Sequence, residues 1–167
     1  MTTHQDPEWL GQTVLMTEVS GLSQMSRPQW AGDECLWCAS THDLQPLEPA
    51  PDLTTRSCKA CWPKRLAKVL TYLEWALHTE SCPACPQGRC PDSHPLVKAY
   101  TDAHTDAVGT DAVPCLRCHQ TVSLAEPLVM PFRWTGPTSY VPYFGFLHAG
   151  ETCPTVRQRG DVTLRAV

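Results

Sequence analysis

The sequence predicts a small α+β protein of two modules, each stabilised by bound zinc in place of a large apolar core. Ten of its 167 residues are cysteines, and eight of these form four Cys-x-x-Cys pairs. Sixteen prolines and nine glycines interrupt the chain, so its helices and strands should be short and its core thin. A Cys-x-x-Cys turn supplies half of a tetrahedral zinc site, and metal sites compensate for a thin core.

Such a cysteine content fits two environments, because cysteines form disulfides outside the cell and hold metals inside it. The first 33 residues carry Gln5, Asp6, Glu8 and Glu18 and have no apolar stretch of signal-peptide length. No segment approaches the roughly 20 apolar residues of a membrane span. We therefore expect a cytoplasmic protein with reduced, metal-bound thiols and no membrane partner.

The chain is expected to divide into an arm, two modules and a tail. Residues 1–33 are weakly patterned and predict an N-terminal arm, with a short strand over Gln12–Val19. The first module covers residues 34–80 and the second covers residues 81–155. Residues 156–167 are expected to be a C-terminal tail. The surroundings of the Cys-x-x-Cys pairs differ, so no internal repeat is expected.

The first module should contain a proline-rich connection over residues 44–54 and then an amphipathic helix. Pro63 suits the first turn of this helix, which should end near residues 78–81. Trp62 and Trp75 are expected on its exposed side. The apolar residues at helical spacing predict the buried face, which comprises Leu66, Val69, Leu70, Leu73, Ala76 and Leu77.

The second module should contain another helix and a β-hairpin. The helix is predicted over Pro95–Val108, with Ser93 as its N-cap. Two extended segments, Thr121–Phe132 and Ser139–Leu147, then predict a hairpin with a long turn.

Two of the cysteine pairs, Cys35-x2-Cys38 and Cys58-x2-Cys61, have the spacing of a four-thiolate zinc site. Because the second pair precedes a helix, residues 33–80 resemble the treble-clef zinc finger. The resemblance implies that zinc holds a short hairpin against the helix start. Pairing Cys58 and Cys61 with the next Cys-x-x-Cys pair is excluded, since a 16-residue helix between them would be about 24 Å long.

The remaining cysteines and two histidines predict two further sites. The series Cys82-x2-Cys85-x4-Cys90-x3-His94 resembles the zinc knuckle, although an iron–sulfur cluster here is an alternative. This knuckle lacks the aromatic residue that stacks on bases, so the resemblance implies a metal and not RNA binding.

The third set resembles a zinc ribbon, and His119 competes with His148 for a place in it. Pairing Cys82 and Cys85 with the fourth Cys-x-x-Cys pair, Cys115 and Cys118, also stays open, and it would leave Cys90, His94, His148 and Cys153 as another site. We expect two to three Zn²⁺ per chain, with three favoured. The third set comprises Cys115, Cys118, His148 and Cys153.

These sites favour a non-enzymatic protein, because four protein ligands leave no open position on the metal. The first module also resembles the scaffold of HNH nucleases, with His42 between its cysteine pairs. However, Trp62, Lys64 and Arg65 stand where that family has Asn or His. A degenerate or atypical nuclease is therefore an alternative, and no small-molecule substrate is indicated.

The charge distribution suggests a partner. The formal net charge is −4, and three thiolate-rich zinc sites would bring it to roughly −8, which excludes attraction to nucleic acid by overall charge. Residues 56–70 nevertheless contain five basic residues and no acid. We expect a small regulatory or phage-type accessory factor that binds nucleic acid through this surface, or an adaptor that docks on a nucleic-acid-associated protein. The surface comprises Arg56, Lys59, Lys64, Arg65 and Lys68.

Overall fold

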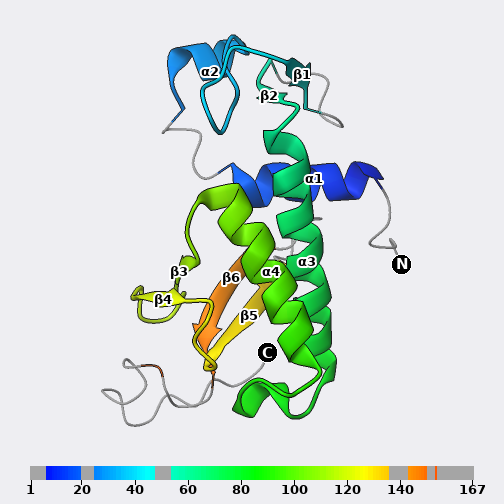
Figure 1. Ribbon diagram of the computed structural model, residues 1–167, viewed down its shortest axis with the longest axis vertical. Helices are drawn as coiled ribbons and strands as arrows, with labels where there is room; N and C mark the ends of the chain where they lie inside the picture. The colour runs from blue at the N-terminus through cyan, green and yellow to red at the C-terminus, as the bar shows by residue number, and fades with distance from the viewer. Residues whose placement is uncertain (1–6, 20–24, 48–53, 136–142, 150–152, 154–167) are drawn as a thin grey trace. The chain divides into compact units, whose positions relative to one another are not determined.

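The computed structural model divides by its internal contacts into two compact units (Figure 1). The first unit comprises residues 1–70 and 134–143, and the second comprises 71–133 and 144–167. The division falls within the longest helix, α3 (Cys61–Ser81). The module boundaries predicted from the sequence stay a prediction. The structure describes residues 7–19, 25–47, 54–135, 143–149 and 153.

The first unit places a short hairpin directly before α3. Strands β1 (Leu44–Pro46) and β2 (Arg56–Cys58) pair antiparallel, with Leu44 opposite Cys58. Helix α3 begins three residues after β2 ends. The hairpin and helix follow each other in the order that the treble-clef resemblance implies. Two helices precede them, α1 (Pro7–Glu18) and α2 (Arg27–Ala31).

The predicted strand over Gln12–Val19 is wrong, because these residues belong to α1 and its C-terminal end. The Thr13 hydroxyl donates to the Trp9 carbonyl at 2.8 Å, and the Thr17 hydroxyl donates to the Thr13 carbonyl at 2.7 Å. Threonine makes such bonds to the preceding helical turn. Thr13 and Val14 are fully buried, so packing of one helix face overrides the β propensity of these residues.

The segment before the first cysteine pair is fixed by a cap and a glycine. Ser26 and Gln29 form a capping box at the start of α2, with bonds of 3.3 and 2.8 Å. Gly32 then has φ +79°, and a Cβ there would lie 2.2 Å from the carbonyl oxygen of Thr54. Only glycine fits this position, which lies three residues before Cys35.

The predicted helix after Cys61 is confirmed as α3, which ends at Ser81. Its buried face is rotated from the predicted one, since Leu70 and Leu77 are 38% and 37% exposed. Trp75, which was expected on the exposed side, is only 1% exposed. Aromatic side chains bury the most area, so Tyr72 and Trp75 outweigh the leucines in orienting the helix. The buried residues of α3 are Val69, Tyr72, Leu73, Trp75, Ala76 and Thr79.

The helix of the second unit agrees with the prediction, but its cap does not. Helix α4 covers Ser93–Val108, and Asp92 occupies the N-cap position. Ser93 is not the cap, because its buried hydroxyl donates to the Cys90 carbonyl at 2.8 Å. The other elements of this part of the chain are η2 (Cys85–Gln87), β3 (Ala112–Pro114), β4 (Thr121–Ser123), β5 (Val129–Trp134) and β6 (Tyr143–His148).

The predicted hairpin over residues 121–132 and 139–147 is only partly right. Strands β5 and β6 form a two-stranded sheet, but Thr121–Ser123 pairs antiparallel with β3 instead, with Val122 opposite Val113. The close pairing follows from the tight turn at Cys115–Cys118 between β3 and β4. Residues 139–142 of the prediction lie outside the described residues.

The core of the second unit is aromatic. The Tyr72 ring stacks on Phe144 at 4.3 Å and meets Tyr100 and Phe146 edge-on, each at 5.5 Å. Such ring pairs stabilise a core beyond the area that they bury. The core residues are Tyr72, Trp75, Ala76, Val97, Tyr100, Val113, Val122, Leu124, Val129 and Phe146.

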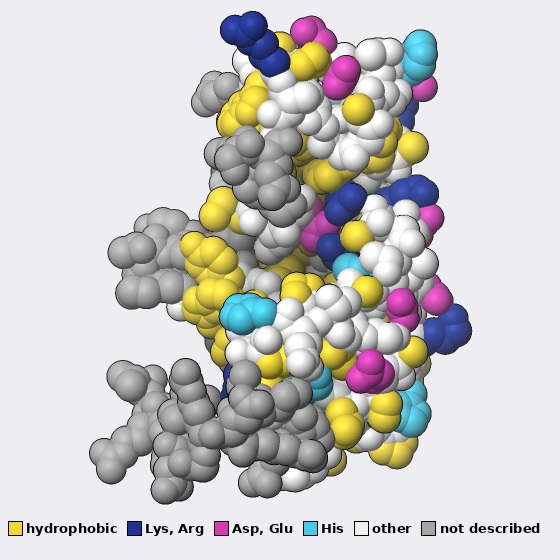
Figure 2. Space-filling view, turned by 90° about the vertical axis from the view of Figure 1, so that its left-hand side faces the viewer, with side chains coloured by type: hydrophobic (Ala, Val, Ile, Leu, Met, Phe, Trp, Pro, Cys, Tyr) yellow, Lys and Arg dark blue, Asp and Glu magenta, His cyan; other side chains and the backbone are white. Residues whose placement is uncertain are grey.

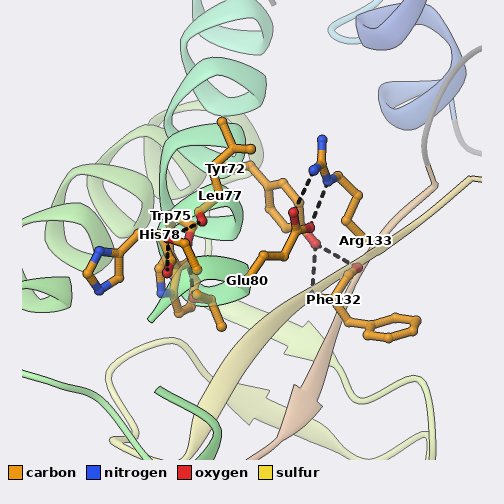
Figure 3. A network of polar contacts seen from close by, with 9 residues as sticks. Tyr72, Trp75, Leu77, His78, Glu80, Phe132 and Arg133 are labelled. Carbon is orange, nitrogen blue, oxygen red and sulfur yellow. Dashed lines mark hydrogen bonds and ion pairs between the residues drawn. The ribbon is translucent and has the colours of Figure 1, made fainter. Parts of the chain in front are cut away.

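The Tyr72 hydroxyl joins α3 to both strands of the β5–β6 sheet. It accepts bonds from the N–H groups of Phe132 and Gly145 at 3.1 and 3.0 Å, and it shares its proton between their carbonyl oxygens at 2.8 and 2.7 Å. Figure 3 shows Tyr72 beside the ion pair of Glu80 with Arg133, which has two bonds of 2.9 and 2.6 Å. Burial raises the pKa of Tyr72, so the hydroxyl keeps its proton.

Candidate metal centres

Cysteine and histidine side chains gather in three groups of four, and each group could hold a metal ion. Within each group, all the potential ligand atoms lie within 4.8 Å of one another. The first centre comprises Cys35, Cys38, Cys58 and Cys61, the second comprises His78, Cys82, Cys85 and Cys90, and the third comprises Cys115, Cys118, His148 and Cys153.

A tight turn builds the first centre. The Cys35 N–H donates to the Ser40 carbonyl at 2.7 Å, and the Ala39 N–H donates to the Cys35 carbonyl at 3.0 Å. Ala39 takes a positive φ of 56° to close the turn. Strand β2 delivers Cys58, and the start of α3 delivers Cys61.

The sulfur positions in this centre suit a tetrahedral metal. The Sγ atoms of Cys38 and Cys58 lie 3.7 Å apart, and zinc bonds of about 2.3 Å would separate two sulfurs by about 3.8 Å. Burial acts to raise the pKa of the Cys58 thiol, but bonds from the Cys61 and Ala60 N–H groups outweigh it and lower the pKa to about 7. A thiol of this kind readily becomes the thiolate that a metal needs.

The second centre forms where α3 ends. His78 and Cys82 are four residues apart, so they lie on the same side of the helix end. The His78 Nε2 atom lies 3.1 Å from the Cys90 Sγ, and the Sγ atoms of Cys85 and Cys90 lie 3.7 Å apart. These positions bring four ligand atoms together within about thirteen residues.

The structure brings His78, and not the predicted His94, to this centre. His94 lies in the first turn of α4, where its side chain is exposed. His78 precedes Cys82 and lies where the helix was expected to end, so the predicted ligand series, which begins at Cys82, does not include it. The spacing His78-x3-Cys82 was the signal that could have identified it.

The third centre repeats the tight turn of the first. The Cys115 N–H donates to the Gln120 carbonyl at 2.9 Å, and the His119 N–H donates to the Cys115 carbonyl at 2.8 Å. His119 has a positive φ of 60° and an exposed side chain. Of the two competing histidines, it is His148 that lies in the third centre, with its Nδ1 atom 3.7 Å from the Cys118 Sγ.

Electrostatics at this turn favour a thiolate. Burial acts to raise the pKa of Cys115, but bonds from the N–H groups of Cys118, Arg117 and His148 lower it to about 6. The alternative that pairs Cys82 and Cys85 with this turn is wrong, because the two belong to separate groups.

The first and third centres share a backbone pattern that the sequence did not reveal. Within each turn, the backbone N–H of the residue after the first cysteine donates to a carbonyl of a strand distant in the sequence. Leu36 donates to the Arg56 carbonyl at 2.9 Å, and Leu116 donates to the Phe146 carbonyl at 2.8 Å. The next ligand, Cys58 or His148, lies two residues beyond that carbonyl. The two turns thus meet their strands in the same register, although their side chains differ.

The basic residues of the predicted binding surface are not equally accessible. Arg65 and Lys68 hold the buried carboxylate of Glu18 at 2.9 and 3.0 Å, and their side chains are only 16% and 15% exposed. The Arg65 guanidinium also lies over the Trp37 ring, 5.5 Å from the ring centroid. The indole N–H of Trp37 donates to the backbone carbonyl of Glu18.

The other three basic residues, Arg56, Lys59 and Lys64, are exposed. Lys59 lies 4.0 Å from Asp43, and both side chains are 72% exposed, so this pair is weak. On the face seen in Figure 2, basic and acidic side chains of the described residues are interspersed.

The residues that would form a nuclease centre do not gather. His42 is exposed and belongs to none of the three groups found among the described residues. Trp62, at a position where the HNH family places a ligand, stacks on Trp37 at 6.1 Å.

Comparison with known proteins adds no relative, since no protein-family model, curated protein or solved structure matches the chain. Among the described residues, no helix is both long and apolar enough to cross a bilayer. The three groups of Cys and His side chains are therefore the features from which a function can be proposed.

Proposed function

We propose that this chain is a non-enzymatic protein that binds three zinc ions, each of which has a structural role. The observation that supports this proposal is the complete set of four side-chain ligands at every centre. Thiolate and imidazole ligands suit zinc, and a catalytic zinc keeps one position open for water or substrate. A protein-filled, thiolate-rich shell leaves no such position.

The three ions would hold together elements that are too short to fold alone. Strands β1 to β4 are three residues each, and an isolated hairpin of this size is unstable in water. The first centre links the hairpin to α3, and the third links the β3–β4 turn to the end of β6. Zinc binding is then inseparable from folding.

The partner that we propose is nucleic acid, contacted through Arg56, Lys59 and Lys64. These residues lie immediately around two ligands of the first centre, Cys58 and Cys61, so a bound ion would fix their backbone. Their exposure supports phosphate contacts, whereas the side chains of Arg65 and Lys68 are only 16% and 15% exposed. The interspersed charges argue for a small, local contact.

Binding to a labelled oligonucleotide at several salt concentrations tests this partner. If all three residues contact phosphates of a duplex, the logarithm of affinity should fall with that of salt at a slope of about −2.7. Replacing Arg56, Lys59 and Lys64 by alanine together should flatten the slope. Lys98→Ala, a change at an exposed lysine of α4, is the control and should leave it unchanged.

Absence of salt-dependent binding by the zinc-loaded protein would overturn the nucleic-acid proposal. Equal slopes for the triple variant and the wild type would place the contact elsewhere. If no salt-dependent binding is found, the adaptor hypothesis, in which a nucleic-acid-associated protein is the partner, takes its place.

A further inference from the structure

The three centres differ in how they expose their ligands. Cys38 of the first centre is exposed, whereas the other eleven ligands are buried or half-buried. Its neighbours Cys35 and Cys58 are 0% and 6% exposed. Reagents in solution can therefore reach Cys38 more readily than any other ligand of the three centres.

The first centre also differs in ligand chemistry. Four thiolates around Zn²⁺ carry a net charge of −2, whereas three thiolates and a neutral histidine carry −1. The additional negative charge makes the sulfurs of a four-thiolate centre more electron-rich and more nucleophilic. Exposure and thiolate character together determine which cysteine is oxidised first.

We propose that Cys38 is a site of oxidative modification through which peroxides release the zinc of the first centre. The Cys38 thiolate attacks one oxygen of hydrogen peroxide, forming a sulfenic acid and releasing hydroxide. The Cys58 thiolate, whose sulfur lies 3.7 Å away, then attacks the sulfenic sulfur and displaces a second hydroxide.

In sum, two thiolates lose two electrons, the peroxide oxygen atoms leave as two hydroxides, and one disulfide forms. Only Cys35 and Cys61 would then remain as ligands for a zinc ion at this centre, and two thiolates would not retain it. A thiol reductant followed by added zinc restores the centre.

Loss of this ion has a defined structural consequence. Cys58 ends β2 and Cys61 begins α3, so the ion joins the hairpin to the helix. The basic residue between them, Lys59, and its neighbours Arg56 and Lys64 would lose their fixed backbone. The inference thus rests on the proposed function and makes nucleic-acid binding sensitive to oxidation.

The test treats the zinc-loaded full chain with hydrogen peroxide in the presence of a chromogenic zinc chelator. One zinc per chain should be released about tenfold faster than the other two. Cys38→His, which keeps a fourth ligand but removes the exposed thiolate, should abolish the fast phase. Met16→Leu, which removes an exposed sulfur outside the centres, should leave it unchanged.

Peptide mapping of the oxidised wild type gives a readout that does not depend on variants. Trypsin cleaves after Arg56 and Lys59, so a Cys38–Cys58 disulfide joins two peptides that are otherwise separate, and fragmentation of the joined peptides shows whether Cys38 or Cys35 forms the bond. A first-formed disulfide without Cys38, or release of all three ions at one rate, would overturn the inference. A protein that holds fewer than three zinc ions before oxidation would instead contradict the proposed function.

Discussion

Replacing His78 by alanine separates the structural ligand set from the one that the sequence favours. The His78 Nε2 atom lies 3.1 Å from the Cys90 sulfur, whereas His94 is exposed on α4. A structural zinc ion contributes about 10–16 kcal/mol of binding free energy. If four ligands share this equally, the loss of one costs about 2.5–4 kcal/mol, or about 60- to 700-fold in affinity.

Competition against a chromogenic chelator, followed by native mass spectrometry, measures this loss. His78→Ala should retain two zinc ions under conditions in which the wild type retains three. His94→Ala is the matched control and should retain all three, and His78→Cys should restore the third ion. Loss of zinc in His94→Ala with none in His78→Ala would refute the assignment.

Three further predictions follow from buried groups. Tyr72→Phe should reduce the free energy of unfolding by about 1–3 kcal/mol, because backbone groups of β5 and β6 lose their partner; denaturant unfolding measures this, and Tyr143→Phe, at a 43% exposed position, should change little. Glu18→Ala should cost about 2–3 kcal/mol in the same assay, since it leaves two largely buried cations without their carboxylate; an unchanged stability would mean that this ion cluster does not hold α1. Lowering the pH below about 6 should weaken zinc binding at the third centre, because the pKa of the metal-free Cys115 thiol is about 6 and protonation below it competes with the metal; a zinc affinity of this centre that does not change between pH 7 and pH 5 would contradict this expectation.

The sequence predicted those features that depend on local spacing. A Cys-x-x-Cys turn requires only a few residues, so the grouping of Cys35 and Cys38 with Cys58 and Cys61 could be predicted from the sequence. Helix α3 was accessible because its apolar residues recur at helical spacing over several turns. The expected length of this helix also correctly placed Cys61 and Cys82 in different metal sites.

Features that depend on tertiary packing could not be predicted from the sequence. Nothing local shows that Glu18 accepts bonds from Arg65 and Lys68, some fifty residues away, so these two cations appeared available to a partner. The strand propensity of Thr13 and its neighbours concealed α1, whose helical form depends on what it packs against. Likewise, Tyr72 joins strands more than fifty residues later, which no periodicity reveals.

The central claim, that bound zinc takes the place of a large core, is tested most directly by counting the metal in the purified protein. Native mass spectrometry of protein expressed with zinc should show three zinc ions per chain, and their removal by a strong chelator under reducing conditions should abolish the cooperative unfolding transition. A chain that carries no zinc, or that unfolds with the same midpoint after complete removal of the metal, would contradict the account.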